Sequence, residues 1–247
     1  MKKNYTILIA FMLLMTTSFA QKGLNIGLNG QYTGITIVNQ NAWGIGQEYD
    51  YAFTTGSSFG FDLGYNFTDE IGVYTGFGMM TLGQDYLDTY KLGENEVSSE
   101  WERNVRLKYN VLPIMFKFTG SETRVNFIGG FGVMFAFLKE AEQTWTQDGS
   151  DYTGEFINEF TDKPFNMGAA DVTDRFETMD IMVNLELGAR IFVIENLYVD
   201  ATVNLAYGLK DINGADWQME DTDGHYNASH NAFGGVKVGV GYVLFGE

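Results

Sequence analysis

The 247-residue sequence contains no cysteine, only two prolines and few basic residues. Without cysteine, the chain has no disulfide framework, no thiolate metal site and no cysteine for a lipoprotein anchor. Its 15 basic and 32 acidic residues give a net charge of −17, and so acidic a chain lacks the basic face that nucleic-acid binding requires. Nothing after residue 20 offers the run of about 18 apolar residues that a transmembrane helix needs.

The chain is instead rich in glycine and aromatic residues, with 30 Gly, 20 Phe and 14 Tyr. Many aromatic residues and few prolines favour long, continuous β-strands. The same composition excludes disordered, collagen-like and coiled-coil proteins. No cofactor is expected.

The first twenty residues have the organisation of a secretory signal peptide. Met1-Lys2-Lys3 is positively charged, the segment from Tyr5 to Met15 is apolar, and Ser18-Phe19-Ala20 carries small residues where signal peptidase cleaves. We therefore predict a signal peptide at residues 1–20 and one mature domain at residues 21–247. An N-terminal membrane anchor is the less favoured alternative, because the apolar core is too short to span about 30 Å of hydrocarbon.

Apolar and polar residues alternate with a period of two along most of the mature chain, which is typical of β-strands with one apolar face. In Gly60-Phe61-Asp62-Leu63-Gly64-Tyr65-Asn66-Phe67, for example, the large apolar side chains share one face. Tilted strands of about 9–11 residues cross a bilayer. The alternation predicts eight strands, at residues 23–38, 60–67, 71–81, 105–118, 125–137, 181–193, 197–209 and 236–244.

The predicted connections alternate between short turns and long loops. The turns lie at residues 68–70, 120–123 and 194–196, and the loops at residues 39–56, 84–104, 138–178 and 210–231. The loops hold 23 acidic and 6 basic residues, which is the whole net charge of −17, because the rest of the chain holds 9 of each sign. This pattern predicts an all-β fold, an eight-stranded antiparallel up-and-down transmembrane β-barrel in the outer membrane, with short periplasmic turns and long extracellular loops. A soluble lipocalin-like carrier, which also closes eight strands, is the alternative.

One predicted strand breaks the alternation. Leu107 and Tyr109 are in phase with each other but out of phase with Leu112 and Ile114, and the shift falls just before Pro113. Because proline cannot donate a hydrogen bond to a β-ladder, we expect a β-bulge near Pro113.

Two segments and the signal peptide carry a resemblance to a known family. The segments are Tyr109-Asn110-Val111-Leu112-Pro113-Ile114-Met115-Phe116-Lys117-Phe118 and the closing Gly239-Val240-Gly241-Tyr242-Val243-Leu244-Phe245. Together with the signal peptide that ends at Ala20-Gln21, they resemble the small outer-membrane β-barrel family of Bacteroidetes that is often labelled PorT-like. The resemblance implies location and architecture, but no single activity or catalytic motif. The family label also suggests an accessory role in a secretion or gliding apparatus.

Charged residues on the polar faces of the strands are the first candidates for a functional site. They are Asp62, Arg106, Lys108, Lys117, Glu186, Arg190, Asp200 and Lys237. Side chains can fill the lumen of an eight-stranded barrel, so we predict a plug of mutually paired charges, with a narrow ion or proton path as the alternative. A turn centred on Glu195 places Arg190 opposite Asp200 and Val193 opposite Leu197.

The last long loop holds the other candidates for chemistry. His225 and His230 are the only histidines, and Ser229 precedes His230. A lipid-modifying enzyme of the outer leaflet would need such a pair within hydrogen-bond reach, which neighbours in sequence do not favour, so we predict no enzyme. Asp221, Asp223 and Asn227 resemble half of a calcium-binding loop, with a solvated acidic loop as the alternative.

Aromatic residues suggest where the membrane and any partner lie. Two sets of aromatic residues are predicted to form interfacial girdles, Phe67, Phe118, Tyr198 and Phe245 near the turns and Tyr32, Phe135, Tyr207 and Phe233 near the loops. Trp43, Trp101, Trp145 and Trp217 fall one to each long loop, where they either support strand extensions or grip a partner. Gln147-Asp148-Gly149-Ser150 predicts a hairpin turn on such an extension. We predict a non-enzymatic, monomeric outer-membrane protein with a structural, adhesive or surface-interaction role. Its expected partners are membrane lipid, lipopolysaccharide and a possible extracellular partner.

Overall fold

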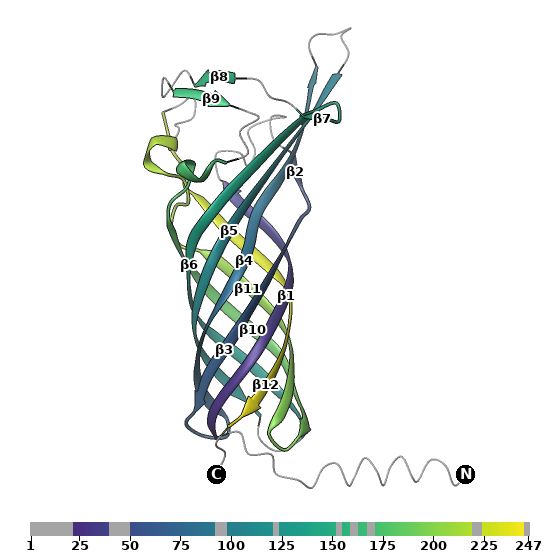
Figure 1. Ribbon diagram of the computed structural model, residues 1–247, viewed down its shortest axis with the longest axis vertical. Coiled ribbons are helices and arrows are strands. Elements are labelled where there is room, and N and C mark those ends of the chain that lie inside the picture. Colours follow the sequence, from purple (N-terminus) through teal and green to yellow (C-terminus); the bar gives the residue numbers. More distant parts are fainter. Residues whose placement is uncertain are drawn as a thin grey trace, which may run out of the picture.

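The computed structural model describes residues 22–39, 50–91, 98–120, 124–151, 155–158, 163–166, 171–218 and 224–244. Within these ranges, eight long antiparallel strands close into a ring, through the pairing of β1 with β12 and of β6 with β10 (Figure 1). The ring contains β1 (Gly23–Asn39), β3 (Thr54–Asn66), β4 (Ile71–Lys91), β5 (Ser98–Thr119), β6 (Val125–Gln147), β10 (Met179–Ile194), β11 (Leu197–Gly208) and β12 (Ser229–Val243). The predicted eight-stranded up-and-down barrel is confirmed. The predicted signal peptide lies outside the described residues.

Several short strands and 3-10 helices lie at one end of the ring. They are β2 (Asp50–Ala52), β7 (Ser150–Asp151), the separate pair β8 (Glu155–Asn158) and β9 (Lys163–Asn166), and the 3-10 helices η2 (Thr173–Arg175) and η3 (Ala215–Trp217). At the opposite end, tight turns join β3 to β4 and β10 to β11, and the end of β5 pairs with the start of β6 (Figure 1). We call these the loop end and the turn end. Among the described residues, no helix combines the length and apolarity needed to cross a membrane.

Large apolar side chains cover the outside of the barrel and remain exposed. Examples from all eight strands are Leu28, Phe61, Phe77, Ile114, Phe131, Leu185, Val203 and Val238. A continuous apolar band of this kind is what the lipid-facing surface of a membrane barrel requires. The soluble carrier is therefore the wrong alternative, because its apolar faces would point inward.

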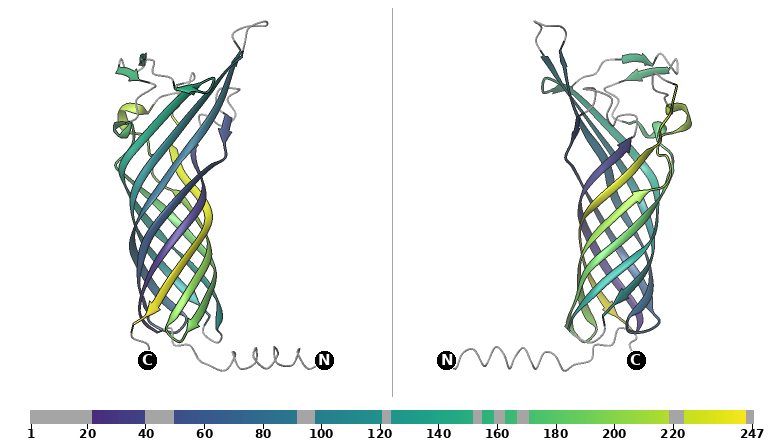
Figure 2. Two further views of the ribbon diagram at one scale, coloured as in Figure 1. Left: turned by 45° about the vertical axis from the view of Figure 1, so that its right-hand side comes forward. Right: turned by 180° about the vertical axis from the view of Figure 1, so that it is seen from behind.

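Three strands continue far beyond this band at the loop end (Figure 2). We call residues 82–91 of β4, 98–109 of β5 and 139–147 of β6 the blade. The predicted loops 84–104 and 138–178 are therefore too long, because residues 84–91, 98–104 and 138–147 belong to strands. The predicted hairpin at the tip of β6 is confirmed, because Gln147 pairs with Ser150 and the two residues between them have φ of 49° and 76°.

The predicted bulge near Pro113 is wrong. On β5, Leu107, Tyr109 and Val111 are all buried on the inward face, so the alternation is unbroken. The register shift lies on the partner strand, where Tyr109 pairs with Leu138 and Lys108 pairs with Glu140, so that one extra residue falls between Leu138 and Glu140. The prediction failed because it assigned every apolar side chain to the lipid face, whereas the lumen itself is apolar at this level.

Candidate functional site in the barrel lumen

Side chains that point into the lumen change character along the barrel axis. Near the turn end they include buried and half-buried charges, which we call the turn-end network: Asp62, Lys117, Glu186, Arg190, Asp200 and Lys237. Near the loop end they form a buried apolar cluster, the loop-end plug: Ile35, Ile37, Met80, Leu82, Tyr86, Val105, Leu107, Tyr109, Val111, Met134, Ala136, Ala141, Val172, Met182, Ala206, Ile212 and Phe233. The two regions fill the barrel by different chemistry.

Glu186 is the centre of the turn-end network. Its carboxylate, on β10, lies 3.3 Å from the Nζ atom of Lys117 on β5 and 3.3 Å from that of Lys237 on β12. The Thr202 hydroxyl also donates to it at 3.2 Å, and Lys237 reaches Asp62 on β3 at 3.8 Å. Because the side chain of Glu186 is only 2% exposed, its charge depends on these partners rather than on water.

Arg190 and Asp200 form a second pair, at the predicted position. The two residues are opposite each other in the β10–β11 ladder, and the guanidinium makes two hydrogen bonds of 2.8 Å to the carboxylate. Arg190 also lies 3.7 Å above the ring centre of Tyr198. The predicted Val193–Leu197 pairing is wrong, because the ladder shifts between Phe192 and Ile194 and it is Ile194 that pairs with Leu197.

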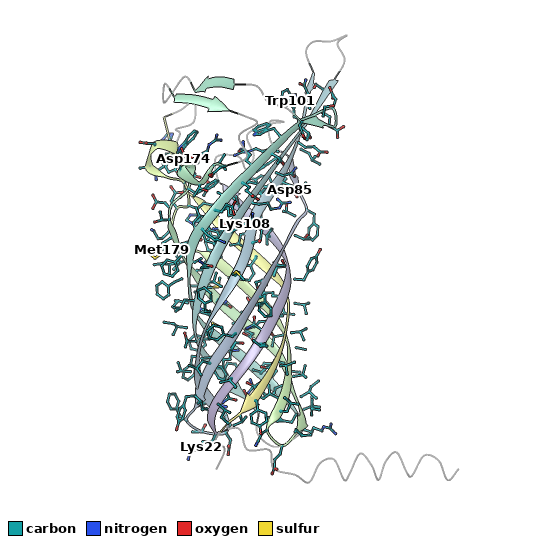
Figure 3. All side chains as sticks on the ribbon, viewed as in Figure 1. Lys22, Asp85, Trp101, Lys108, Asp174 and Met179 are labelled. Atoms are coloured by element: carbon teal, nitrogen blue, oxygen red, sulfur yellow. The ribbon has the colours of Figure 1, made fainter. Side chains whose placement is uncertain are left out.

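Arg106 and Lys108 do not join the network. They alternate with the inward-facing Leu107 and therefore lie on the outward face of the blade. The Arg106 guanidinium lies 2.6 Å from the carboxylate of Asp85, and Lys108 lies 2.8 Å from that of Glu142. Figure 3 labels Asp85 and Lys108 near the loop end. The prediction reversed the inward and outward faces of this part of β5, because it assigned every apolar side chain to the lipid face.

Sequence reasoning missed the tyrosines of the turn-end network. Tyr74 is 3% exposed; its hydroxyl donates to Asn66 at 2.9 Å, and Lys117 lies 4.9 Å from its ring centre. Its position between Gly72 and Gly76 on the predicted polar face would have revealed it. Tyr198 was assigned to the girdle but is 4% exposed inside the barrel. Phe233 was assigned in the same way and belongs to the loop-end plug.

A cavity of about 50 Å³ remains between the two regions. Its lining includes Glu186 and Lys237 from the network and Met80, Met134 and Phe233 from the plug. A buried water needs roughly 10–15 Å³ of such volume and polar partners, so the cavity has room for a few waters beside the charges. The plug lies between it and the loop end.

The loop-end plug has a polar centre and an outer cover. Asn231 donates to the Asp180 carboxylate at 3.0 Å and to the Tyr109 hydroxyl at 3.2 Å, and all three residues are buried. Above them, the backbone N–H of Val172 donates to the carbonyl of Ala141 at 2.9 Å. The segment that contains η2 is thereby fixed against the blade, and Val172 is buried in the plug.

The last long loop does not bring its serine and histidine together. Ser229 is 1% exposed, and its hydroxyl accepts a hydrogen bond of 2.9 Å from Asn213. His230 stacks on Tyr207, with ring centres 5.4 Å apart. As neighbours on β12, Ser229 and His230 point to opposite faces, so the geometry does not support proton transfer between them.

The calcium candidates gain no support. Asp221 and Asp223 lie outside the described residues, and Asn227 alone is described. Within the described part of the chain, no three acidic, histidine or cysteine side chains are grouped to hold a metal ion.

Asp211 organises the described part of this loop. Its carboxylate accepts hydrogen bonds from the backbone N–H groups of Asn213 and Ser229 at 3.1 and 3.0 Å, and from the hydroxyl of Tyr226. Burial and the hydrogen bond to Asp211 raise the pKa of Tyr226. The loop is therefore tied to the first residue of β12.

Comparison with known proteins agrees with this architecture. A model of the family described as outer membrane protein beta-barrel domain matches residues 19–214. Similar solved structures include the N-terminal β-barrel domain of OprF from Pseudomonas aeruginosa (12% identity, TM-score 0.38, 90% of this chain and 100% of that chain). Neisserial surface protein A (12%, 0.43, 90% and 98%) and Ail of Yersinia pestis (10%, 0.39, 90% and 99%) are similar too. No curated protein matches the chain.

Proposed function

The chain belongs to the family of outer membrane protein beta-barrel domains, and we propose that it is a non-enzymatic, monomeric surface protein that acts through its loop end. The observation that carries the proposal is the filled lumen. Paired charges occupy it near the turn end and a buried apolar cluster occupies it near the loop end. A barrel that is closed at two levels is poorly suited to transport, so the surface outside the membrane is the remaining place for function.

The orientation follows from how such barrels assemble. Short turns remain in the periplasm and long loops face outward, so the proposal places the blade and its acidic loops outside the cell. A signal peptide at residues 1–20 would deliver the chain for export. The resemblance of its strand motifs to the PorT-like family supports an origin in Bacteroidetes.

The blade is the part of the molecule that supports adhesion or another surface interaction. It raises strands β4, β5 and β6 above the apolar band (Figure 2). Its outward face carries the charged side chains of Arg106 and Lys108. Lipid would contact the apolar band, lipopolysaccharide would surround the base of the blade, and an external partner would meet its tip. An accessory role in secretion or gliding rests on the family resemblance alone.

Epitope tags at the two ends test this proposal. Gly149 lies at the tip of the blade hairpin, where a Cβ atom would meet nothing within 4 Å, so an insertion there is expected to be tolerated. Antibody should reach the Gly149 tag on intact cells and reach a matched tag at Asp69, in the β3–β4 turn, only after the outer membrane is permeabilised. The reverse pattern would contradict the proposed orientation and place the blade in the periplasm.

A second arm tests the site of action. Adhesion of cells to surfaces and to one another should fall when residues 147–150 are replaced by a tagged glycine-serine loop. A lumen variant, Glu186→Gln, serves as the matched control at equal surface level and should leave adhesion unchanged. Loss of adhesion with the lumen variant alone would contradict the proposal.

A further inference from the structure

A hollow of about 270 Å³ opens on the outside of the barrel, over strand β10. Its walls are the exposed, outward-facing side chains of Phe131 on β6, Val183 and Leu185 on β10, and Leu205 and Tyr207 on β11. The three strands are neighbours in the ring (Figure 1). We call this feature the β10 hollow, and it lies within the apolar band of the barrel.

The strand register places the hollow at a definite depth. Leu185 is opposite both Phe131 and Leu205 in the ladders, and Val183 is opposite Tyr207. The hollow therefore spans two successive outward-facing rows of the sheet. Because β10 runs from the loop end to the turn end and these residues lie in its first half, the hollow is in the half of the band that is nearer the loop end.

The side chains at the rim of the hollow lean away from β10. The ring of Phe131 packs on Phe116 of β5, with ring centres 5.5 Å apart. Leu205 covers Gly234 of β12, where an added Cβ atom would lie 2.8 Å from Leu205 Cδ2. Tyr207 stacks on the histidine of β12, with ring centres 5.4 Å apart. Since all three side chains pack toward strands beyond the hollow, space remains over β10.

The floor of the hollow is backbone that is already paired. Asn184 and Ala206 also line it, but both residues are buried on the inward face, so only their main chain reaches the hollow. They are opposite each other in the β10–β11 ladder, and each is paired on its other side as well. Water would find few hydrogen-bond partners at this floor, whereas a hydrocarbon chain needs none.

We propose that the β10 hollow binds one acyl chain of a lipid from the leaflet that surrounds the loop end. The hollow is continuous with the surface that meets lipid, and its depth is one that a chain from this leaflet reaches. Each contact between the chain and the walls is weak, but many such contacts together hold the chain longer than the smooth wall elsewhere does. The inference goes beyond the proposed function and does not depend on which end of the barrel faces the cell exterior.

Photolabelling in lipid vesicles tests the inference. The purified full-length protein is reconstituted into phosphatidylcholine vesicles that contain a small fraction of phosphatidylethanolamine with a diazirine in the middle of one acyl chain. After illumination, mass spectrometry measures the label on the peptides that contain Val183 and Leu185. The reference peptides contain Phe59 and Met79, which are exposed in the apolar band on β3 and β4, and β3 is four strands from β10 around the ring.

We expect at least about threefold more label at the hollow than at the reference peptides, because chain contacts are more numerous in the hollow. The tag experiment at Gly149 measures orientation and is independent of this ratio, so failure of the inference is distinguishable from failure of the proposed function. Equal label on the two walls would overturn the inference.

A glycine substitution closes the hollow without replacing a residue that lines it. In Gly234→Val the new side chain should push Leu205 off β12 and over β10, so the excess of label should disappear. Gly30→Val on β1 is the matched control, because a Cβ atom there meets only a backbone oxygen, at 3.9 Å, and it should keep the excess. An unchanged excess in Gly234→Val would contradict the site.

A second variant fills the hollow directly. Val183→Phe should also abolish the excess of label, whereas Val238→Phe, at an exposed position on β12, should not. Heat-modifiable migration on gels verifies that each variant is folded, and Val183→Phe keeps the inference testable if Gly234→Val does not fold. A second copy of the chain is the competing occupant. If chemical crosslinking shows a dimer in the vesicles that Gly234→Val dissociates, the hollow is a protein interface and the acyl-chain site is wrong.

Discussion

The turn-end network and the loop-end plug fill the same barrel in opposite ways. The network holds its charges through directional contacts between strands far apart in sequence, such as Lys117 with Glu186. The plug packs apolar side chains without preferred directions and adds Val172 and Ile212 from the loops. Substitutions should therefore destabilise the two regions for different reasons. In the network they leave an unpaired charge, and in the plug they leave a cavity.

The largest effect is expected for Glu186→Ala. Removal of this carboxylate leaves Lys117 and Lys237 buried without their main partner, which should lower the free energy of unfolding by about 3–5 kcal/mol. Urea titration of the folded barrel in lipid vesicles measures it. A triple variant should lose less free energy of unfolding than Glu186→Ala alone, because it leaves no unpaired buried charge; its changes are Lys117→Met, Glu186→Met and Lys237→Met. A larger loss in the triple variant would mean that the ion pairs themselves stabilise the barrel.

Asp200→Ala should have the next largest effect. This substitution leaves the buried Arg190 without its carboxylate partner. Because Asp200 is 14% exposed, water can partly solvate the unpaired charge, so we expect the free energy of unfolding to fall by about 3 kcal/mol. The double variant Arg190→Leu, Asp200→Leu should lose less free energy of unfolding than the two single variants lose in sum. A double-mutant cycle in urea measures the coupling, and additivity within about 0.5 kcal/mol would show that the two side chains act independently.

In the plug, Leu107→Ala tests packing without charge. Leu107 is fully buried, and truncation to alanine should lower the free energy of unfolding by about 2–5 kcal/mol, because it leaves a cavity in the packed cluster. Leu112→Ala on the outward face of the same strand is the matched control, and lipid should fill its gap at little cost. Equal losses for both leucines would contradict the plug as a packed core.

The smallest effect lies outside both regions, at Tyr226. Because the folded loop raises the pKa of Tyr226 above its ordinary value of 10.0, the folded state favours the protonated phenol. The contribution of this pKa shift to the free energy of unfolding is fully present below about pH 10. It is lost as the pH rises toward the higher pKa of the folded state. Fluorescence of Trp217, in the same loop, should change only in this alkaline window. Tyr226→Phe should abolish this fluorescence change, whereas the control Tyr32→Phe should not affect it. If the fluorescence change persists in Tyr226→Phe, it does not arise from ionisation of Tyr226.

Much of the barrel was predictable because alternation is a local property. Strand positions, the tight turns at residues 68–70 and 194–196 and the Arg190–Asp200 pair all follow from a period of two and from turn geometry. Near the turn end the lipid face is apolar and most of the lumen is polar, so most faces are predicted correctly there; Tyr198, which lies inside the barrel, is an exception.

The same reasoning failed at the loop end, where the polarity of the two faces reverses. Above the apolar band, Arg106 and Lys108 point outward and Leu107 and Tyr109 point into the lumen. A period of two reveals that a strand has two faces but not which one meets lipid. The blade, the bulge on β6 and the plug could not be predicted for this reason, since each depends on where the membrane ends.

Single-channel recording in planar lipid bilayers tests the closed lumen most directly. The purified full-length protein should show no stable conductance, because the network and the plug each fill the barrel. The triple methionine variant of the network should also remain silent, since the plug is intact in it. Stable, porin-like current steps from the wild-type protein would contradict the closed lumen and the function proposed from it.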